Sequence, residues 1–132
     1  MPTNKAVVLV VEDEALVRMN AVGLLQDAGY EVLEAPDTEH ALAILESRTD
    51  IGLVFTDVEM PGPMDGIGLA HRIRERWPLV LMVVASGKAI VDQSRLPVGA
   101  RFLGKPYADG IIVGAMAQMF AANDLRPVGL AS

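Results

Sequence analysis

The sequence predicts an α/β domain built on a five-stranded parallel sheet, and three observations support this fold class. Short apolar runs alternate with amphipathic stretches along the whole chain, as expected where each strand is followed by a helix. The strongest runs are rich in Val and Leu and lack polar alternation, which is typical of strands buried on both faces. With 132 residues, the chain is long enough for one domain with a single core. We therefore expect a doubly wound fold with helices on both faces of the sheet.

Five strands are expected in chain order. Three are continuous apolar runs that should be central: Ala6–Val11, Leu53–Phe55 and Leu79–Ala85. The other two, Glu31–Ala35 and Arg101–Gly104, are of mixed polarity or short, so we expect them nearer the edges of the sheet. Right-handed crossovers then favour the strand order 2-1-3-4-5.

Helices are expected where apolar residues recur at helical spacing. They span Glu14–Ala28, Thr38–Ser47, Asp65–Trp77 and Asp109–Asn123. In the first, the apolar residues at helical spacing are Leu16, Val17, Ala21, Leu24, Leu25 and Ala28, and Gly29 is a plausible stop. In the last, the residues available to face the sheet are Ile112, Met116, Met119 and Phe120. Asp37 is placed to cap the second helix.

Two segments are less regular. Between Lys88 and Gly99 there are few apolar residues and Pro97 interrupts, so we expect a short or irregular fourth helix there. Arg126–Ser132 should form a loosely held tail. We therefore expect one domain over residues 1–125 and a tail over residues 126–132.

Composition disfavours several classes of function. Seventeen acidic against 11 basic residues give a net charge of −6, which would repel a nucleic-acid backbone. The chain has no cysteine, so disulfides and cysteine-ligated metal sites are impossible. The charge-free stretch Gly110–Asn123 falls short of the roughly 20 residues that a spanning helix needs. The first apolar run is too short for a signal-peptide core. We expect a soluble, cytoplasmic protein that binds neither nucleic acid nor membrane.

Polar side chains follow four of the five predicted strands at the point where each strand ends. They are Glu12 and Asp13 after the first strand, Asp57 after the third, Ser86 after the fourth, and Lys105 with Pro106 after the fifth. Open α/β sheets bind ligands outside the carboxyl ends of their strands. In the expected strand order the strands that carry these residues are neighbours, so the side chains should converge on one crevice.

Three carboxylates held together repel one another, and either a shared proton or a hard cation with oxygen ligands relieves the repulsion. Mg²⁺ suits such a site because it needs only one or two carboxylates together with water and phosphate oxygens. The negative charge of an entering phosphoryl group would be countered by the metal and by Lys105, and Ser86 could donate a hydrogen bond. Asp57 is then the candidate nucleophile, which would form an acyl phosphate.

This set of residues resembles the response-regulator receiver family of two-component signalling, in its single-domain, flavodoxin-like form, over most of the chain. The resemblance implies that Asp57 accepts a phosphoryl group from a histidine kinase or a histidine phosphotransfer protein. It implies Mg²⁺ bound by Asp13, Asp57 and the backbone carbonyl of Glu59. Glu12 would help to position the metal, partly through water, because it is one methylene longer than the family's usual aspartate.

The resemblance also assigns roles in signalling. Phe102 matches an aromatic switch position that acts with Ser86, although plain core packing also accounts for Phe102. Glu59 and Lys88 match positions that tune dephosphorylation, and we expect them to pair across the mouth of the crevice. The loop from Met60 to Gly66 is one residue longer than is usual in the family.

We expect a phosphoacceptor that assists its own phosphorylation and dephosphorylation rather than an enzyme. It would signal through protein contacts with an unidentified target, and two copies could pair through the face formed by the fourth helix, fifth strand and fifth helix. One alternative is a receiver-like interaction module that works without phosphate. A flavodoxin-like cofactor binder fits the fold, but the acidic stretch Val11–Ala15 does not suit a phosphate cradle. His40 and His71 fall within predicted helices and are not expected in the site.

Overall fold

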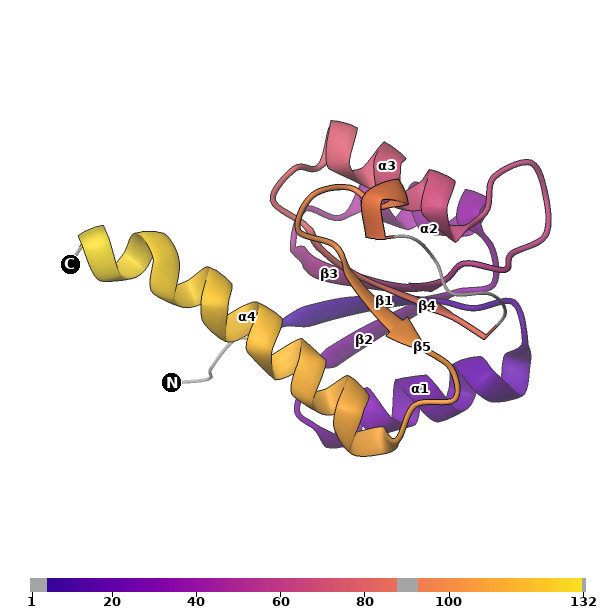
Figure 1. Cartoon of the computed structure of the whole chain (residues 1–132), viewed down its shortest axis with the longest axis horizontal. Helices are drawn as coiled ribbons and strands as arrows, with labels where there is room; N and C mark the ends of the chain where they lie inside the picture. Colours follow the sequence, from indigo (N-terminus) through magenta and orange to yellow (C-terminus); the bar gives the residue numbers. More distant parts are fainter. Residues whose placement is uncertain (1–4, 88–92, 132) are drawn as a thin grey trace.

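In the computed structural model, five parallel strands form one sheet in the predicted order β2-β1-β3-β4-β5 (Figure 1). The structure describes residues 5–87 and 93–131, with side chains for residues 5–87 and 94–123. The strands are β1 Val7–Val11, β2 Glu31–Ala35, β3 Ile51–Asp57, β4 Leu81–Ser86 and β5 Arg101–Gly104. The two strands expected near the edges, β2 and β5, are the edge strands.

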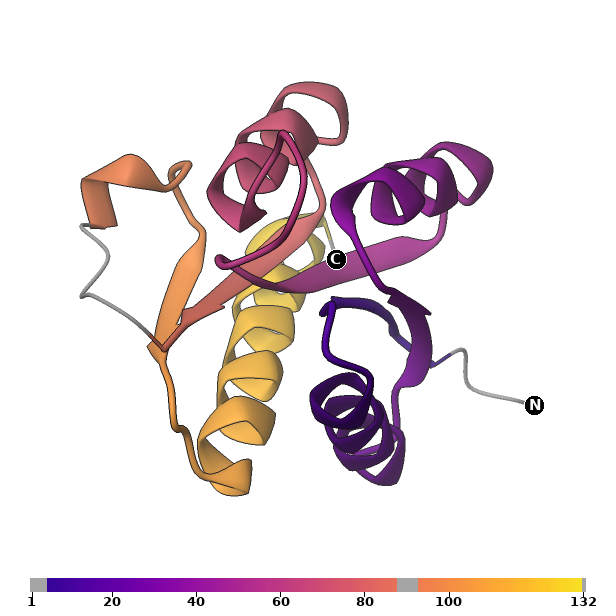
Figure 2. The ribbon, with the colours of Figure 1, turned by 90° about the vertical axis from the view of Figure 1, so that its right-hand side faces the viewer.

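Helices cover both faces of the sheet, as predicted (Figure 2). They are α1 Ala15–Asp27, α2 Thr38–Ser47, α3 Gly66–Arg76 and α4 Asp109–Ala131, with a 3₁₀ turn η1 at Gln93–Arg95. The helices α2 and α3 pack on one face, while α1 and α4 pack on the other. Within the described residues, no helix is both long enough and apolar enough to span a bilayer.

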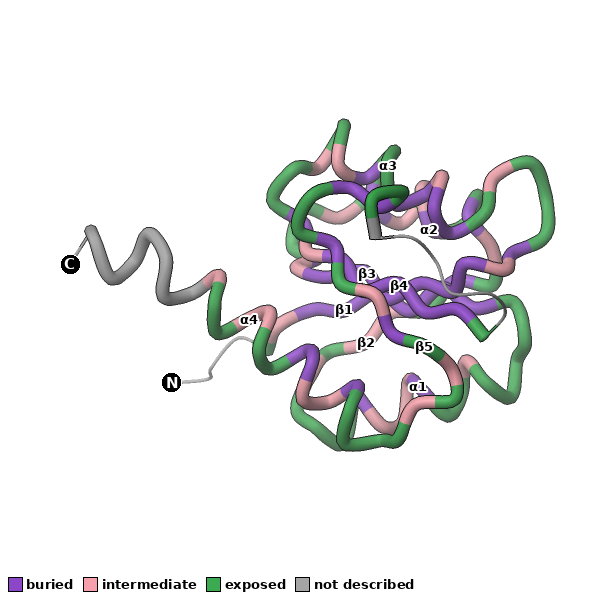
Figure 3. The backbone as a smooth tube through the Cα atoms, viewed as in Figure 1, coloured by how far each residue is buried: buried purple, intermediate pink, exposed green. Residues whose placement is uncertain are grey.

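The core is split into two layers by the sheet, because successive side chains of a strand point to opposite faces. Leu9, Val54 and Val84 face α2 and α3, whereas Val8 and Phe55 face α1 and α4. Every residue of β1 is buried (Figure 3). The absence of polar alternation in the sequence of this strand follows from its burial on both sides.

Side-chain caps start two of the helices. Asp37 Oδ1 accepts a hydrogen bond of 2.8 Å from the His40 amide at the start of α2, as predicted. Asp65 Oδ1 accepts one of 2.9 Å from the Gly68 amide at the start of α3. After α1 the chain turns at Gly29, whose φ of 103° is left-handed and favours glycine.

The buried face of α1 is narrower than the sequence pattern suggested. Ala21 and Leu25 are buried against the sheet, but Leu16 is 80% exposed and Ala28 is also exposed. Leu16 lies in the first turn of the helix, and Ala28 follows the last turn. Leu16 has the helical spacing of the buried residues, but it does not belong to the core.

Residues 93–100, the described part of the segment before β5, are irregular, in keeping with the low apolar content and Pro97. They form only the turn η1, followed by a hydrogen bond from the Ala100 amide to the Pro97 carbonyl. Two side chains of α3 contact backbone carbonyls of this described part. Arg74 Nη2 donates to the Val98 carbonyl at 2.7 Å, and His71 Nε2 lies 2.6 Å from the Arg95 carbonyl.

The last helix is longer than predicted. We expected it to end at Asn123 and to be followed by a tail from Arg126, but α4 runs to Ala131. Figure 1 shows its carboxyl-terminal part, drawn in yellow, extending away from the sheet. A helix makes its backbone hydrogen bonds internally, so it can continue beyond the last residue that packs on the sheet.

One register shift aligns the strand ends. Val7 of β1 pairs with Ile51 of β3, but Val8 pairs with Leu53, so Gly52 is an extra residue in β3. The shift leaves Val11 opposite Thr56. As a result, Glu12, which follows Val11, lies level with Asp57, which follows Thr56.

The start of α3 lies against the end of β3. The Gly66 amide donates to the Val58 carbonyl at 3.0 Å, and the Val58 amide donates to the Ala85 carbonyl of β4 at 2.8 Å. A Cβ atom at Gly66 would lie 2.0 Å from the Asp57 carbonyl oxygen, a backbone atom that cannot move independently. Only glycine allows this close approach.

We predict that Gly66→Ala lowers the free energy of unfolding by about 1–3 kcal/mol, because overpacking displaces β3 from α3. A matched control is Gly23→Ala in α1, where a Cβ atom would meet nothing within 4 Å. That variant should gain about 0.5–1 kcal/mol from helix propensity. Urea denaturation followed by circular dichroism measures both values. Equal stability of the two variants would contradict the close approach at Gly66.

Candidate functional site

The pairing of the strands brings the predicted site residues to one edge of the sheet. Asp57 of β3 pairs with Ala85 of β4, so Ser86 comes one residue further along β4. Ser86 in turn pairs with Gly104 of β5, and Lys105 follows Gly104. The convergence expected from the sequence is confirmed in the structure.

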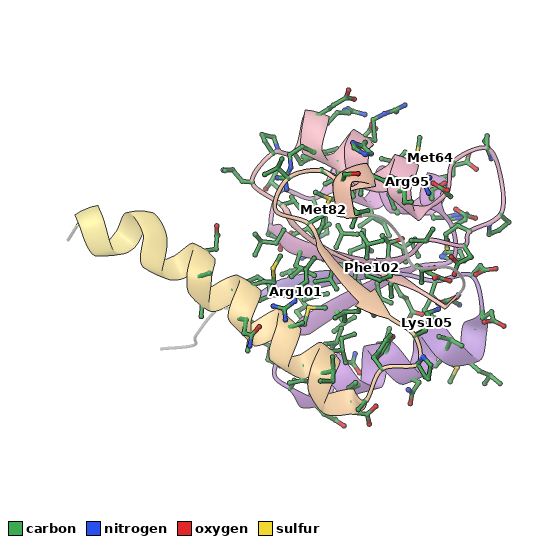
Figure 4. The ribbon with its side chains drawn as sticks, in the orientation of Figure 1. Met64, Met82, Arg95, Arg101, Phe102 and Lys105 are labelled. Atoms are coloured by element: carbon green, nitrogen blue, oxygen red, sulfur yellow. The ribbon has the colours of Figure 1, made fainter. Side chains whose placement is uncertain are left out.

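Lys105 joins two carboxylates from different strands. Its Nζ atom lies 3.3 Å from Asp57 Oδ1 and 3.4 Å from Glu12 Oε1. Figure 4 shows Lys105 just beyond the end of β5. The carboxylates are 8% and 5% exposed, respectively, as whole residues, so these ion pairs are shielded from water.

The three acidic residues can offer oxygen ligands to one cation. One carboxylate oxygen each from Glu12, Asp13 and Asp57 lie within 4.8 Å of one another, with Asp13 exposed and the other two residues buried. Asp57 Oδ1 is buried and, among the described residues, accepts no hydrogen bond of standard geometry. A buried carboxylate oxygen in this position fits a hard cation such as Mg²⁺, which prefers oxygen ligands.

Burial and charge act against each other in this cluster. Burial raises the pKa of Asp57, and the attraction of Lys105 opposes the rise without cancelling it. The pKa of Glu12 is also raised by burial, although the Glu14 amide and Lys105 pull it down. Burial lowers the pKa of Lys105, but its attraction to Asp57 and Glu12 outweighs burial, so the net shift is upward. The three groups therefore depend on one another for their charge states.

Arg18 fixes the loop that carries the acidic pair, a role that we did not predict. Its Nη1 atom donates to the Glu12 carbonyl at 2.8 Å, and its Nε atom donates to Glu34 Oε1 at 2.9 Å. The Glu12 side chain bends back, so that Oε2 accepts a hydrogen bond of 3.1 Å from the Glu14 amide at the start of α1. The sequence does carry a signal for this role: Arg18 stands one turn into the helix that follows the acidic pair.

Glu59 lies against the end of β4. Ser86 Oγ donates to Glu59 Oε2 at 2.5 Å, and the Gly87 amide donates to Glu59 Oε1 at 3.3 Å. We had expected Glu59 to pair with Lys88, which lies outside the described residues. The described contacts of the Glu59 carboxylate are with the hydroxyl of the expected switch residue and the amide beside it.

Ser86 and Phe102 lie on the same side of the sheet. Phe102 pairs with Val84, and both pack in the core layer that faces α2 and α3. Ser86 is two residues after Val84 and therefore points to the same face. Phe102 is partly buried against this core, near the middle of Figure 4. The switch role of Phe102 remains a prediction.

Tyr107 lines the other side of the site, a position that we did not predict. It borders a small cavity together with Glu12, Asp57 and Lys105. Its ring packs edge-on against Phe55 with centroids 6.0 Å apart, and burial raises the pKa of its hydroxyl. Its position two residues after Lys105 was the only signal in the sequence.

The two histidines make contacts that do not involve the acidic residues of the site. His40 Nδ1 lies 2.7 Å from Asp37 Oδ1 at the start of α2. His71 contacts the segment before β5, as described above. Neither belongs to the group of acidic residues that could hold a metal ion.

Comparison with known proteins places this arrangement in a family. The family model described as the response regulator receiver domain matches residues 8–117. Sensor kinase CckA of Brucella abortus is 36% identical over 126 residues, which cover 92% of this chain and 13% of the kinase. Transcriptional regulatory protein PdtaR of Mycobacterium tuberculosis is 34% identical over 112 residues, 83% of this chain and 54% of the regulator. The chain thus spans about half or less of the length of these relatives.

Solved structures agree with the sequence comparison. A response regulator receiver protein from Sinorhizobium medicae superposes with a TM-score of 0.84 at 28% identity, covering 90% of this chain and 97% of that one. The receiver domain of the hybrid histidine kinase CckA superposes with a TM-score of 0.74 at 36% identity, covering 86% and 98% of the two chains. The range that matches the family model, residues 8–117, contains Glu12, Asp57, Ser86 and Lys105, which the structure gathers at one edge of the sheet. The chain therefore belongs to the response-regulator receiver domain family.

Proposed function

We propose that this chain is a response-regulator receiver domain that accepts a phosphoryl group on Asp57 in a Mg²⁺-dependent reaction. The donor would be a histidine kinase or a histidine phosphotransfer protein, and the chain would act in the cytoplasm as one step of a phosphorelay. The observation that carries the proposal is the 3.3 Å ion pair between Lys105 and Asp57 inside the acidic cluster. A buried carboxylate beside a fixed ammonium group has the nucleophile and the charge partner that phosphoryl transfer needs.

The reaction uses groups of this chain. A carboxylate oxygen of Asp57 forms a bond to the phosphorus atom while the phosphorus–nitrogen bond of phosphohistidine breaks, and the imidazole leaves. Lys105 Nζ, within 3.4 Å of both buried carboxylates, counters the added negative charge. Asp13, Asp57 and the Glu59 carbonyl would hold Mg²⁺, with Glu12 acting partly through water. When bound, the metal supplies positive charge to the phosphoryl oxygens.

Phosphorylation would then change a surface. In the proposed switch, Ser86 moves toward the phosphoryl group and Phe102 turns into the space that is released. Their common position on the α2 and α3 face supports this coupling. A shift from 1:99 to 99:1 would need about 5.5 kcal/mol of differential stabilisation, so we expect a partial shift of population.

The output is proposed to be a protein contact. Within this proposal the chain is a phosphoacceptor that assists its own phosphorylation and dephosphorylation, and it turns over no separate substrate. The surface formed by η1, β5 and α4 would meet a protein target or a second copy of the chain. The net charge of −6 supports a protein partner over nucleic acid.

A second candidate is a receiver-like interaction module that works without phosphate. The observation that favours it is that residues 93–100, the described part of the segment expected to carry the fourth helix, form only the three-residue turn η1. Such a module would need neither a metal ion nor a reactive carboxylate, so the two measurements below separate the candidates.

Asp57→Asn should abolish labelling by a small acyl-phosphate donor in the presence of Mg²⁺, because the amide is a poor nucleophile. Intact mass spectrometry would show the added phosphoryl group on the wild-type chain and none on the variant. The matched control is Asp50→Asn, an exposed aspartate immediately before the same strand at its opposite end. Labelling of Asp57→Asn at the wild-type level would defeat the assignment.

Asp13→Asn should weaken Mg²⁺ binding at least about tenfold, since losses of that size follow the removal of even indirect metal partners. Isothermal titration calorimetry measures the affinity, with Asp50→Asn again as the control. Unchanged affinity in Asp13→Asn would mean that the acidic cluster does not hold the ion. Absence of binding to the wild-type chain would favour the second candidate.

A further inference from the structure

The Glu59 carboxylate is bound in a two-point contact at the end of β4. Oε2 accepts the Ser86 hydroxyl at 2.5 Å, and Oε1 lies 3.3 Å from the Gly87 amide nitrogen. Both oxygens of one anionic group are thus held by two adjacent donors. Ser86 is only 4% exposed, so its hydrogen bond to Glu59 is largely shielded from water.

These donors lie beside the phosphoacceptor. Asp57 pairs with Ala85 in the sheet, which places Ser86 and Gly87 at the next two positions along the neighbouring strand end. The backbone on both sides is fixed: the Val58 amide donates to the Ala85 carbonyl, and the Lys105 amide donates to the Ser86 carbonyl, each at 2.8 Å. Two oxygens of a phosphoryl group on Asp57 would find the same hydroxyl and amide that Glu59 now uses.

The two anionic groups cannot both receive the Ser86 proton. A serine hydroxyl has a single O–H donor, so a hydrogen bond to Glu59 excludes one to a phosphoryl oxygen. Hydrogen bonds to a charged acceptor are also stronger than those between neutral groups. Any phosphoryl group that recruits Ser86 must therefore first displace the Glu59 carboxylate.

We propose that Glu59 is an internal competitor that occupies the Ser86 hydroxyl and the Gly87 amide until a phosphoryl group on Asp57 displaces it. The inference rests on the proposed function, since it assumes that an anion arrives at Asp57. It adds a residue that sets how readily Ser86 switches. The role differs from a Glu59–Lys88 pair, because the competition acts through the switch residue itself.

The competition predicts the effect of removing the carboxylate. Glu59→Ala should bind the phosphoryl analogue beryllium trifluoride roughly tenfold more tightly in the presence of Mg²⁺, because a charge-assisted hydrogen bond no longer has to be broken. It should also take label from a small acyl phosphate faster than the wild-type chain does. Glu59→Gln keeps the shape of the side chain but offers a neutral acceptor, so its affinity for the analogue should lie between those of the wild-type chain and Glu59→Ala.

A double-mutant cycle separates competition from simple charge repulsion. In a Ser86→Ala background only the longer contact with the Gly87 amide remains, so adding Glu59→Ala should change analogue affinity much less, by about twofold. The charge control is Glu14→Ala, because Glu14 is an exposed carboxylate at the same edge of the sheet whose side chain makes no cap hydrogen bond. It should leave the affinity unchanged.

The contact can also be tested without an anion. In the unphosphorylated protein, the amide resonance of Gly87 should move in Glu59→Ala and stay in place in Glu14→Ala.

Three outcomes would overturn the inference: an unshifted Gly87 resonance, unchanged analogue affinity in Glu59→Ala, or an equal gain with and without the Ser86 hydroxyl. If the wild-type chain binds the analogue but takes no label, the proposed function fails, and the affinity cycle still decides the role of Glu59. If the wild-type chain neither binds the analogue nor takes label, both proposals fail.

Discussion

The site depends on the balance between the Lys105 ammonium and the buried carboxylates of Asp57 and Glu12. Each group alone would lose much of its hydration where it lies, and removal of one partner would leave a buried charge uncompensated. Both carboxylates lie within 3.4 Å of Lys105 Nζ, so one positive charge balances one of the two negative charges. The remaining negative charge, increased by Asp13 at the rim, is what makes this edge of the sheet suitable for a divalent cation.

The backbone provides the alignment that this balance requires. The extra residue at Gly52 brings Asp57 level with Glu12, and the glycine at position 66 lets α3 begin against the Asp57 carbonyl. Neither glycine has a chemical role. Their contribution is geometric, because a buried ion pair is stabilising only when its two partners are well aligned. The same reasoning applies to Arg18, which holds the Glu12 backbone from α1.

The sheet also separates two tasks. Asp57 is two residues after Phe55 in β3, so it points to the same face of the sheet, toward α1 and α4. Asp57, Lys105 and Tyr107 line one small cavity on that face. Ser86 and Phe102 point to the opposite face, toward α2 and α3. Glu59 crosses between the ends of β3 and β4 and contacts Ser86. The carboxylates that Lys105 contacts thus lie on one side of the sheet, and the Ser86 hydroxyl lies on the other.

Much of this protein could be predicted from the order of its residues, because apolar periodicity reports burial and strand ends converge in any parallel sheet. The strand order, the edge strands and the convergence of Asp57 with Lys105 are of this kind, and the structure confirms them. The exposure of Leu16 and the extension of α4 to Ala131 were missed, since periodicity does not reveal where the sheet beneath a helix ends.

The contacts of individual side chains were decided by tertiary structure alone. Glu59 has Ser86 as its partner and Tyr107 borders the acidic cluster because segments distant in the chain meet across neighbouring strands. Sequence spacing carries no information about which way such side chains turn once they arrive. The sequence by itself therefore determined the fold and the chemical groups of the site, whereas the packing of the folded chain decided which of those groups hold one another.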